Sequence, residues 1–392
     1  MAKKPLITIN GAYHKIKKGF VTVDNRYRKI KKAFVTVGGV YRPFWSGGKL
    51  VYHGTGTSLQ SARTQVQGAT IGSYAIFAGG ALNTQSSGRS AQVDVYDRYL
   101  THTTLSDVLS AAVARHTSAS SSTHAIFAGG METSSAASTS VTAYNASLTR
   151  TIPASALTSG RYYPAATSID ANVLIAGGHK NASTFFSTVE LYDGSLTHIS
   201  GGALGVLSTE RGRLSGARAG NYAVFAGGLT ASTTSSKVVD CFDASGTKIT
   251  SSAALKATRA YMGATTFLDH AIFAGGRRPE STGWQKYGLG TVEVFSPSLT
   301  RTDLSLVGTT RELLAAASTR EYAVFAGGEY DTRVVADVDY MDASMTITKH
   351  ESALSSARSE LGSATVGDYI IFAGGENIQN NSLSVVDVFA VK

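Results

Sequence analysis

The stretch Tyr74-Ala75-Ile76-Phe77-Ala78-Gly79-Gly80 is an apolar run that ends on two glycines, and it decides the fold because the chain repeats it. Six further runs end on the same Ala-Gly-Gly, and their first glycines follow at intervals of 47 to 52 residues, at 129, 177, 227, 275, 327 and 374. A regular period of this length is typical of an array of similar structural units. The paired glycines predict a position that needs a positive φ or a close approach of two backbones.

Each unit predicts four short strands. A first strand precedes the apolar run, and the glycines are followed by a polar loop and an alternating strand such as Val93-Asp94-Val95-Tyr96-Asp97. A turn of the Asx type, as at Asn145–Leu148 and Asp193–Leu196, then leads to a last strand. Four consecutive antiparallel strands form one blade of a β-propeller, so the sequence predicts an all-β fold with seven blades.

The order of an Arg, an Ile-Phe-Ala-Gly-Gly run and a Val-Asp-Val-Tyr-Asp strand resembles the kelch repeat over residues 49–392. It departs from that family because no blade has the tryptophan usual in the fourth strand, and no Pro precedes the Arg. The last unit stops after its third strand, while Lys49-Leu50-Val51-Tyr52-His53 precedes the first Arg. We therefore expect this N-terminal strand to complete the seventh blade, which removes an exposed sheet edge.

An internal comparison of the units predicts a set of structural ion pairs. An Arg stands 16 residues before the first glycine in six units, and an acid stands in the third strand of the same six. The second unit lacks both, since Val113 and Thr142 occupy the two positions. This joint loss predicts a charge-assisted pair within each blade. The predicted pairs are Arg63 with Asp94, Arg161 with Glu190, Arg211 with Asp240, Arg259 with Glu293, Arg311 with Asp339, and Arg358 with Asp387.

The position two residues after this Arg varies widely in chemical type among the units, although the sequence around it repeats. Variation of this kind is expected of a surface that fits an asymmetric ligand, and unselected drift gives the same pattern. The loop 277–290 is the longest after a glycine pair and opens on the same side of the disc. Its Arg, Trp and Tyr side chains are types that supply much binding energy. The predicted binding residues are Gln65, Arg115, Tyr163, Arg213, Tyr261, Glu360, Arg277, Arg278, Trp284 and Tyr287, with Leu313 completing the ring.

The N-terminus is a separate, strongly basic segment. Residues 1–50 contain twelve Lys and Arg against the single acid Asp24, whereas the whole chain has a net charge of +9. The stretch Tyr13–Val23 recurs 14 residues later as Tyr27–Val37, and Asp24-Asn25 and Gly38-Gly39 are typical hairpin turns. We expect two domains, a small basic β-meander at residues 1–47 and the propeller at residues 48–392. A piece this small buries little core, so it should dock on a partner.

The basic segment resembles the short basic β-repeat segments at the ends of tailed-bacteriophage structural proteins. That resemblance implies anchoring to other virion proteins. Nucleic-acid binding is an alternative, because Lys and Arg interleaved with Tyr and Phe can follow phosphates, and a solvated basic face is another. The residues expected to anchor the chain are Lys15, Lys17, Lys18, Arg28, Lys29, Lys31 and Lys32.

The sequence contains no signature of catalysis. It has one cysteine, Cys241, and no Gly-x-Ser-x-Gly, Cys-x-x-Cys, Walker or His-Glu-x-x-His motif, so we expect no enzyme activity, no metal and no cofactor. The start lacks the apolar region of a signal peptide, and no run of 18 apolar residues predicts membrane insertion.

Taken together, these features favour a phage virion protein, made in the host cytoplasm, whose propeller binds a glycan or protein on the host surface. An intracellular kelch module for protein–protein interaction is the alternative. A carbohydrate-active enzyme is the third hypothesis, because a propeller site can assemble from distant blades.

Overall fold

The computed structural model describes residues 48–82, 88–250, 253–278 and 288–392, apart from the side chain of Ala203. Within residues 1–47 it describes only the backbone of six strands. The chain divides into two compact units, residues 1–51 with 391–392 and residues 52–390.

The N-terminal segment forms three two-stranded antiparallel hairpins. Their strands are β1 (Leu6–Ile9) with β2 (Ala12–Lys15), β3 (Phe20–Val23) with β4 (Arg26–Lys29), and β5 (Lys32–Val37) with β6 (Val40–Ser46). Val23 pairs with Arg26 and Val37 pairs with Val40, and the predicted turn dipeptides Asp24-Asn25 and Gly38-Gly39 lie outside the described residues.

The larger unit is a seven-bladed β-propeller, as the repeats predicted. The first three blades contain β8 (Gln67–Ile71), β9 (Tyr74–Ala78), β10 (Val93–Asp97) and β11 (His102–Thr104); β12 (Thr117–Ser120), β13 (His124–Ala128), β14 (Val141–Asn145) and β15 (Arg150–Thr151); β16 (Ala165–Ile169), β17 (Asn172–Ala176), β18 (Val189–Tyr192) and β19 (His198–Ile199). A short 3-10 helix, η1 (Gly201–Ala203), follows the third blade.

The next three blades follow the same order, with a small extra hairpin after the glycines of the fourth and sixth. They contain β20 (Ser215–Ala219), β21 (Tyr222–Ala226), β24 (Val239–Phe242) and β25 (Lys248–Ile249); β26 (Gly263–Phe267), β27 (His270–Ala274), β28 (Thr291–Phe295) and β29 (Arg301–Ser305); β30 (Ala315–Ser318), β31 (Tyr322–Ala326), β34 (Val338–Asp342) and β35 (Ile347–Lys349). The extra hairpins are β22 (Leu229–Ala231) with β23 (Thr234–Ser235), and β32 (Glu329–Tyr330) with β33 (Arg333–Val334).

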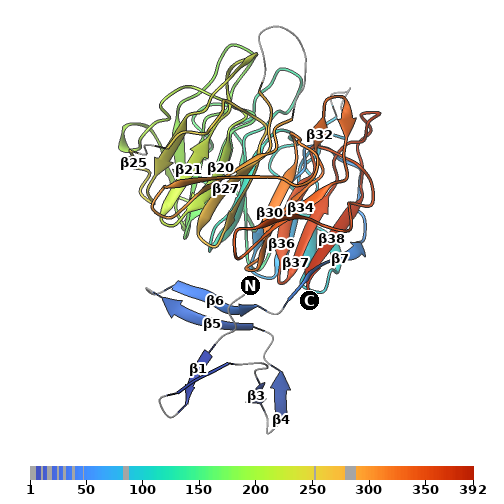
Figure 1. Ribbon diagram of the computed structural model, residues 1–392. Coiled ribbons are helices and arrows are strands. Elements are labelled where there is room, and N and C mark those ends of the chain that lie inside the picture. The colour runs from blue at the N-terminus through green and yellow to red at the C-terminus, as the bar shows by residue number, and fades with distance from the viewer. Residues whose placement is uncertain are drawn as a thin grey trace. The chain divides into compact units, whose positions relative to one another are not determined.

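The seventh blade closes the ring in the predicted way. Its sheet has the order β36 (Gly362–Val366), β37 (Tyr369–Ala373), β38 (Val386–Val391) and β7 (Leu50–Thr55). In Figure 1 the blue strand β7 lies beside the red strand β38, so one sheet joins both ends of the propeller sequence. The Tyr52 hydroxyl donates to Asp387 Oδ1 at 2.6 Å within this blade. The first strands of neighbouring blades pack against each other, and β36 packs on β8, so they enclose a central channel.

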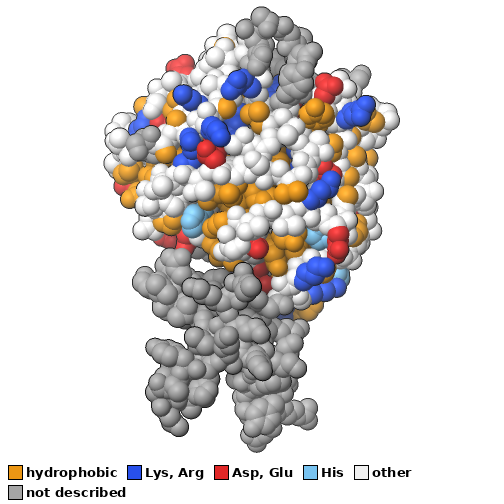
Figure 2. Space-filling model, in the orientation of Figure 1, with side chains coloured by type: hydrophobic (Ala, Val, Ile, Leu, Met, Phe, Trp, Pro, Cys, Tyr) orange, Lys and Arg blue, Asp and Glu red, His pale blue; other side chains and the backbone are white. Residues whose placement is uncertain are grey.

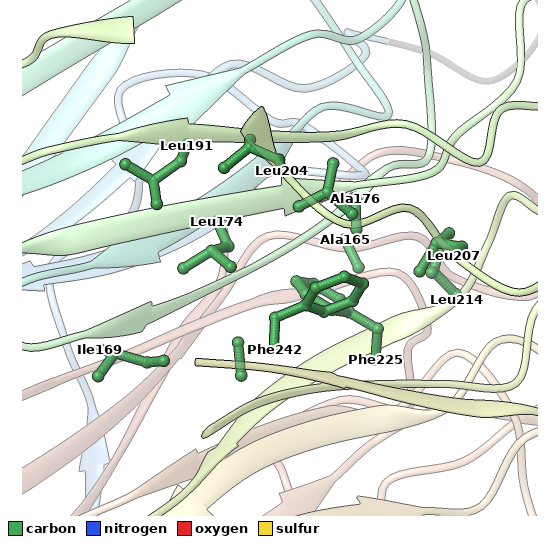
Figure 3. Close-up of a cluster of buried hydrophobic side chains, with 12 residues drawn as sticks. Ala165, Ile169, Leu174, Ala176, Leu191, Leu204, Leu207, Leu214, Phe225 and Phe242 are labelled. Carbon is green, nitrogen blue, oxygen red and sulfur yellow. The ribbon is translucent and has the colours of Figure 1, made fainter. Parts of the chain in front are cut away.

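The hydrophobic core lies between successive blades. Figure 3 shows the cluster between the third and fourth blades, where Phe225 and Phe242 lie beside Leu174 and Leu191. In the second and third strands of each blade, successive side chains point to opposite faces of the sheet and are nearly all buried, because a neighbouring blade covers each face. On the face drawn in Figure 2, basic, acidic and uncharged side chains of the propeller are interspersed among hydrophobic ones.

The first glycine of each pair allows one blade to approach the next. Gly227 has a φ of +63°, and a Cβ placed on it would lie 2.4 Å from the carbonyl oxygen of Arg259 in the following blade. The second glycine donates its N–H to that same oxygen, as Gly228 does at 2.9 Å. The glycine pair is therefore a joint between blades, which supports the close approach predicted from its sequence.

The six Arg and acid positions form buried ion pairs within their blades. Nitrogen–oxygen distances are 2.6 Å for Arg161–Glu190 and Arg211–Asp240, 2.9 Å for Arg311–Asp339 and 2.7 Å for Arg358–Asp387, and Arg63–Asp94 and Arg259–Glu293 also pair. In the second blade the Thr142 hydroxyl accepts the Ser110 N–H at 3.0 Å, the place that a carboxylate takes elsewhere. These residues hold each blade to the loop that enters it.

Candidate binding site at the mouth of the central channel

The seven variable residues form a ring around one end of the central channel. They are Gln65, Arg115, Tyr163, Arg213, Tyr261, Leu313 and Glu360, one from the start of each blade, and are called the ring residues below. All seven have a φ between +51° and +61°, although none is glycine. Left-handed backbone at a residue with a side chain costs of order 1–3 kcal/mol and persists only where the surrounding structure fixes it.

A belt of backbone hydrogen bonds fixes this conformation. Six ring residues donate their N–H to the carbonyl oxygen of the ring residue on the preceding blade, over 2.8 to 3.5 Å. The belt includes the bond from Gln65 to Glu360, which crosses from the first blade to the last. Because the backbone supplies these bonds, the side chain at each position is free to differ without loss of the fold.

A cavity of about 260 Å³ opens on the outer side of the ring. Besides the ring residues, it is lined by Ala81, Arg89, Arg277, Glu329 and Glu376. A second cavity, of about 270 Å³, lies on the inner side, where Gln67, His116 and Thr117 join the ring. The far part of the channel is lined mainly by Ser, Thr and Ala, with Arg218 as its charged residue.

Five side chains on one side of the mouth form an alternating stack of arginine and tyrosine. Arg115 and Arg213 lie 5.3 and 3.9 Å from the ring centroid of Tyr163, and Arg213 and Arg277 lie 4.7 and 4.5 Å from that of Tyr261. Guanidinium groups over aromatic faces gain cation–π attraction, which grows when the site is desolvated. The stack therefore holds Arg213 in one orientation between two rings, which come from the blades on either side.

The opposite side of the mouth is acidic. Glu360 Oε2 accepts a hydrogen bond of 2.7 Å from the Gln65 side-chain amide, and Glu329 and Glu376 line the same cavity. The glutamates come from the sixth and seventh blades, whereas the arginines come from the first five. The site is thus dipolar, with a cationic and aromatic half facing an acidic half.

Burial sets the protonation of two groups in the cationic half. It raises the pKa of Tyr163 to about 12, so this phenol stays protonated at neutral pH. Burial also lowers the pKa of His179 to about 4. His179 stacks on Tyr163 with ring centroids 5.9 Å apart, and its neutral imidazole adds no charge beside Arg213.

The other predicted binding residues are placed differently. Arg277 lines the outer cavity, and its guanidinium pairs with Glu312 at 3.2 Å. Arg278 is exposed and does not line the cavity, while Trp284 and Tyr287 lie outside the described residues. Among the anchoring residues, Lys17, Lys18 and Lys31 lie outside the described residues, and Lys15, Arg28, Lys29 and Lys32 are placed by their backbone alone.

The sequence interpretation missed a second ring at the mouth. The residue after each glycine pair bridges to the residue after the scaffold Arg position, as Ala81 does to Thr64 and Glu376 to Ser359. This brings Arg277, Glu329 and Glu376 to the cavity. The sequence does contain a signal of this second ring, because the residue two positions after the first glycine is of six different types in the seven blades.

No group of three or more His, Cys, Asp or Glu side chains in the described part of the chain is arranged to hold a metal ion. Over the same residues, no helix is long and apolar enough to cross a bilayer. No protein-family model matches the sequence, and no curated protein is significantly similar to it.

Proposed function

We propose that this chain is a virion protein of a tailed bacteriophage that carries a kelch-type propeller and binds a ligand on the host surface. In this proposal residues 1–47 attach the chain to other virion proteins. The propeller then presents the mouth of its central channel to a host glycan or protein.

The ring of seven variable residues carries the binding part of the proposal. One backbone conformation is repeated in all blades, yet its seven positions present five types of side chain, and the two arginines among them are held against tyrosine. A cavity lined by oriented polar groups is the usual form of a ligand site. The structural pairs and glycines lie behind this ring, so ligand specificity could change without changing the scaffold.

The basic segment carries the anchoring part. Its backbone forms three short hairpins from a 14-residue repeat, and short two-stranded hairpins are at best marginally stable in isolation. Docking on another virion protein would supply the missing burial. The resemblance to the basic repeats of phage structural proteins favours this partner over nucleic acid.

The proposal is tested on particles of the phage that encodes the chain. Mass spectrometry should find the chain in purified virions, and antibodies against the propeller should label the particles and block adsorption. Virions produced with a chain that lacks residues 1–47 should lose the propeller, while a variant with intact hairpins and Arg98→Gln should retain it. Absence of the full-length chain from purified virions would contradict the proposed setting and favour an intracellular binding module.

A further inference from the structure

Arg213 is the one arginine at the channel mouth whose guanidinium has no hydrogen-bond acceptor among the described residues. Its guanidinium lies over the faces of Tyr163 and Tyr261. By contrast, Arg115 Nε donates to the Gln65 side-chain oxygen at 3.3 Å, and Arg277 pairs with Glu312. An oriented, half-buried guanidinium with free N–H groups is ready to bind a planar anion through two parallel hydrogen bonds.

The surrounding charges select an anion with a single negative group. Besides Arg213, the cavity is lined by Arg89, Arg115 and Arg277, and these cations are offset by Glu329, Glu360 and Glu376 and, at Arg277, by the paired Glu312. A ligand with several adjacent negative groups would place one of them against these carboxylates, where like charges repel. In the acidic half, Glu360 can accept further hydrogen bonds from a ligand besides the one from Gln65, because an ionised carboxylate accepts through about four lone-pair sites.

The volume of the outer cavity favours a small ligand. The outer cavity of about 260 Å³ is near the lower end of ligand pockets, which span roughly 300–1,000 Å³. The Gln65 amide, bonded to both Glu360 and Arg115, adds a neutral donor and acceptor between the two halves. One pyranose unit meets these demands, since its hydroxyls can donate to Glu360 and accept from Arg115.

We infer that the channel mouth binds an acidic sugar, a monosaccharide unit with one carboxylate that Arg213 holds and hydroxyls that face Glu360 and Gln65. This inference rests on the proposed binding role of the mouth and names its ligand class. This ligand class excludes acidic peptides and phosphates, because both would place more than one negative charge at the site.

The experiment uses the full chain and matched sugars. Binding of the methyl glycosides of glucuronate, galacturonate and N-acetylneuraminate is measured by NMR titration against methyl glucoside and methyl galactoside. At least one acid should bind with a Kd about tenfold or more below that of the neutral sugars. Arg213→Gln should abolish this preference, while Arg98→Gln, which removes an exposed arginine from the turn after β10, should preserve it at an unchanged melting temperature.

Three results would overturn the inference: no preference for any acid over the neutral sugars, a preference that survives in Arg213→Gln, or tighter binding of glucose 6-phosphate or an Asp-rich and Glu-rich peptide. These results differ from failure of the proposed function. A chain that is found in virions but ignores acidic sugars refutes the ligand class alone, and a chain that binds acidic sugars but is absent from virions refutes the setting alone.

Discussion

Arg211 and Asp240 form a fully buried ion pair of 2.6 Å that joins the loop entering the fourth blade to its third strand. Burial alone would raise the pKa of Asp240, but the Arg211 guanidinium and hydrogen bonds from Lys248 and Ser208 lower it below its ordinary value. Asp240→Ala leaves the Arg211 guanidinium buried without a partner charge, and we expect it to lower the unfolding free energy by about 3–5 kcal/mol in denaturant titrations. Arg211→Ala should cost less, because Lys248 and Ser208 still bind Asp240, at 2.8 and 2.6 Å.

The second blade supplies the matched control for that pair. It has Val113 and Thr142 at the two positions, and the Thr142 hydroxyl takes over the hydrogen bond from the preceding loop. The double variant Arg211→Val with Asp240→Thr should therefore be more stable than either alanine variant, because no charge is stranded. The exposed Lys256, 3.9 Å from Asp303, should tolerate alanine at a cost under about 0.5 kcal/mol. Equal losses in all four variants would show that the pairs are not the scaffold.

The glycine joint between blades is tested by a pair of alanine variants. A Cβ on Gly227 would lie 2.4 Å from the Arg259 carbonyl oxygen, whereas a Cβ on Gly367, which also has a positive φ of +58°, would meet nothing within 4 Å. Gly367→Ala should cost only the conformational strain, about 1–2 kcal/mol. Gly227→Ala should cost clearly more, because two blades must separate. Similar thermal melting of the two variants would rule out the joint.

The repeating part of the fold was predictable from the sequence because the same pattern of residues recurs in each blade. Gly79-Gly80 and its equivalents marked the blades, and the joint loss at Val113 and Thr142 identified the pairs. Partners outside the repeat were not predictable. Asp94 also binds His102 at 2.7 Å, whereas Asp240 binds Lys248, because the fourth strand differs from blade to blade.

The sequence predicted the binding site at the channel mouth only in part, because some of its contacts join residues from different blades. The variable position after the scaffold Arg identified the ring, but its left-handed backbone depends on hydrogen bonds between blades, such as Gln65 to Glu360, which form only when the propeller closes. Stacking of Arg213 between Tyr163 and Tyr261 links residues 50 and 48 positions apart, and local sequence contains no sign of it.

Closure of the propeller through β7 predicts a sharp boundary for truncation. Removing residues 1–55 deletes the fourth strand of the last blade together with Tyr52, the partner of Asp387, and exposes the edge of β38. Removing residues 1–47 leaves β7 in place. We expect the longer deletion to lower the melting temperature by several degrees or more and to promote aggregation. The shorter deletion should melt close to the full chain, and equal melting of both would contradict closure by β7.

The burial of His116 predicts that the unfolding free energy decreases at acidic pH. Burial lowers its pKa to about 3, so it stays neutral in the folded state while the unfolded chain takes up a proton near pH 6.5. The unfolding free energy should therefore fall as the pH decreases from 6.5, by about 1.4 kcal/mol per unit, until the folded protein also protonates near pH 3. Three of the other six blades have Leu at this position, namely Leu214, Leu314 and Leu361. His116→Leu should remove this slope, and an unchanged pH dependence would contradict a buried neutral imidazole.

The central claim is that the propeller binds its ligand at the channel mouth, and adsorption tests it most directly. The full chain, purified and added to host cells, should compete with the phage for adsorption sites. A double variant with Arg115→Ala and Arg213→Ala should lose this competition while its melting temperature stays within a few degrees, because neither side chain takes part in the buried pairs or the backbone belt. Arg218→Ala, at the other end of the channel, should compete as well as the unmodified chain. Full competition by the folded double variant would contradict the account, since the binding surface would then lie away from the mouth.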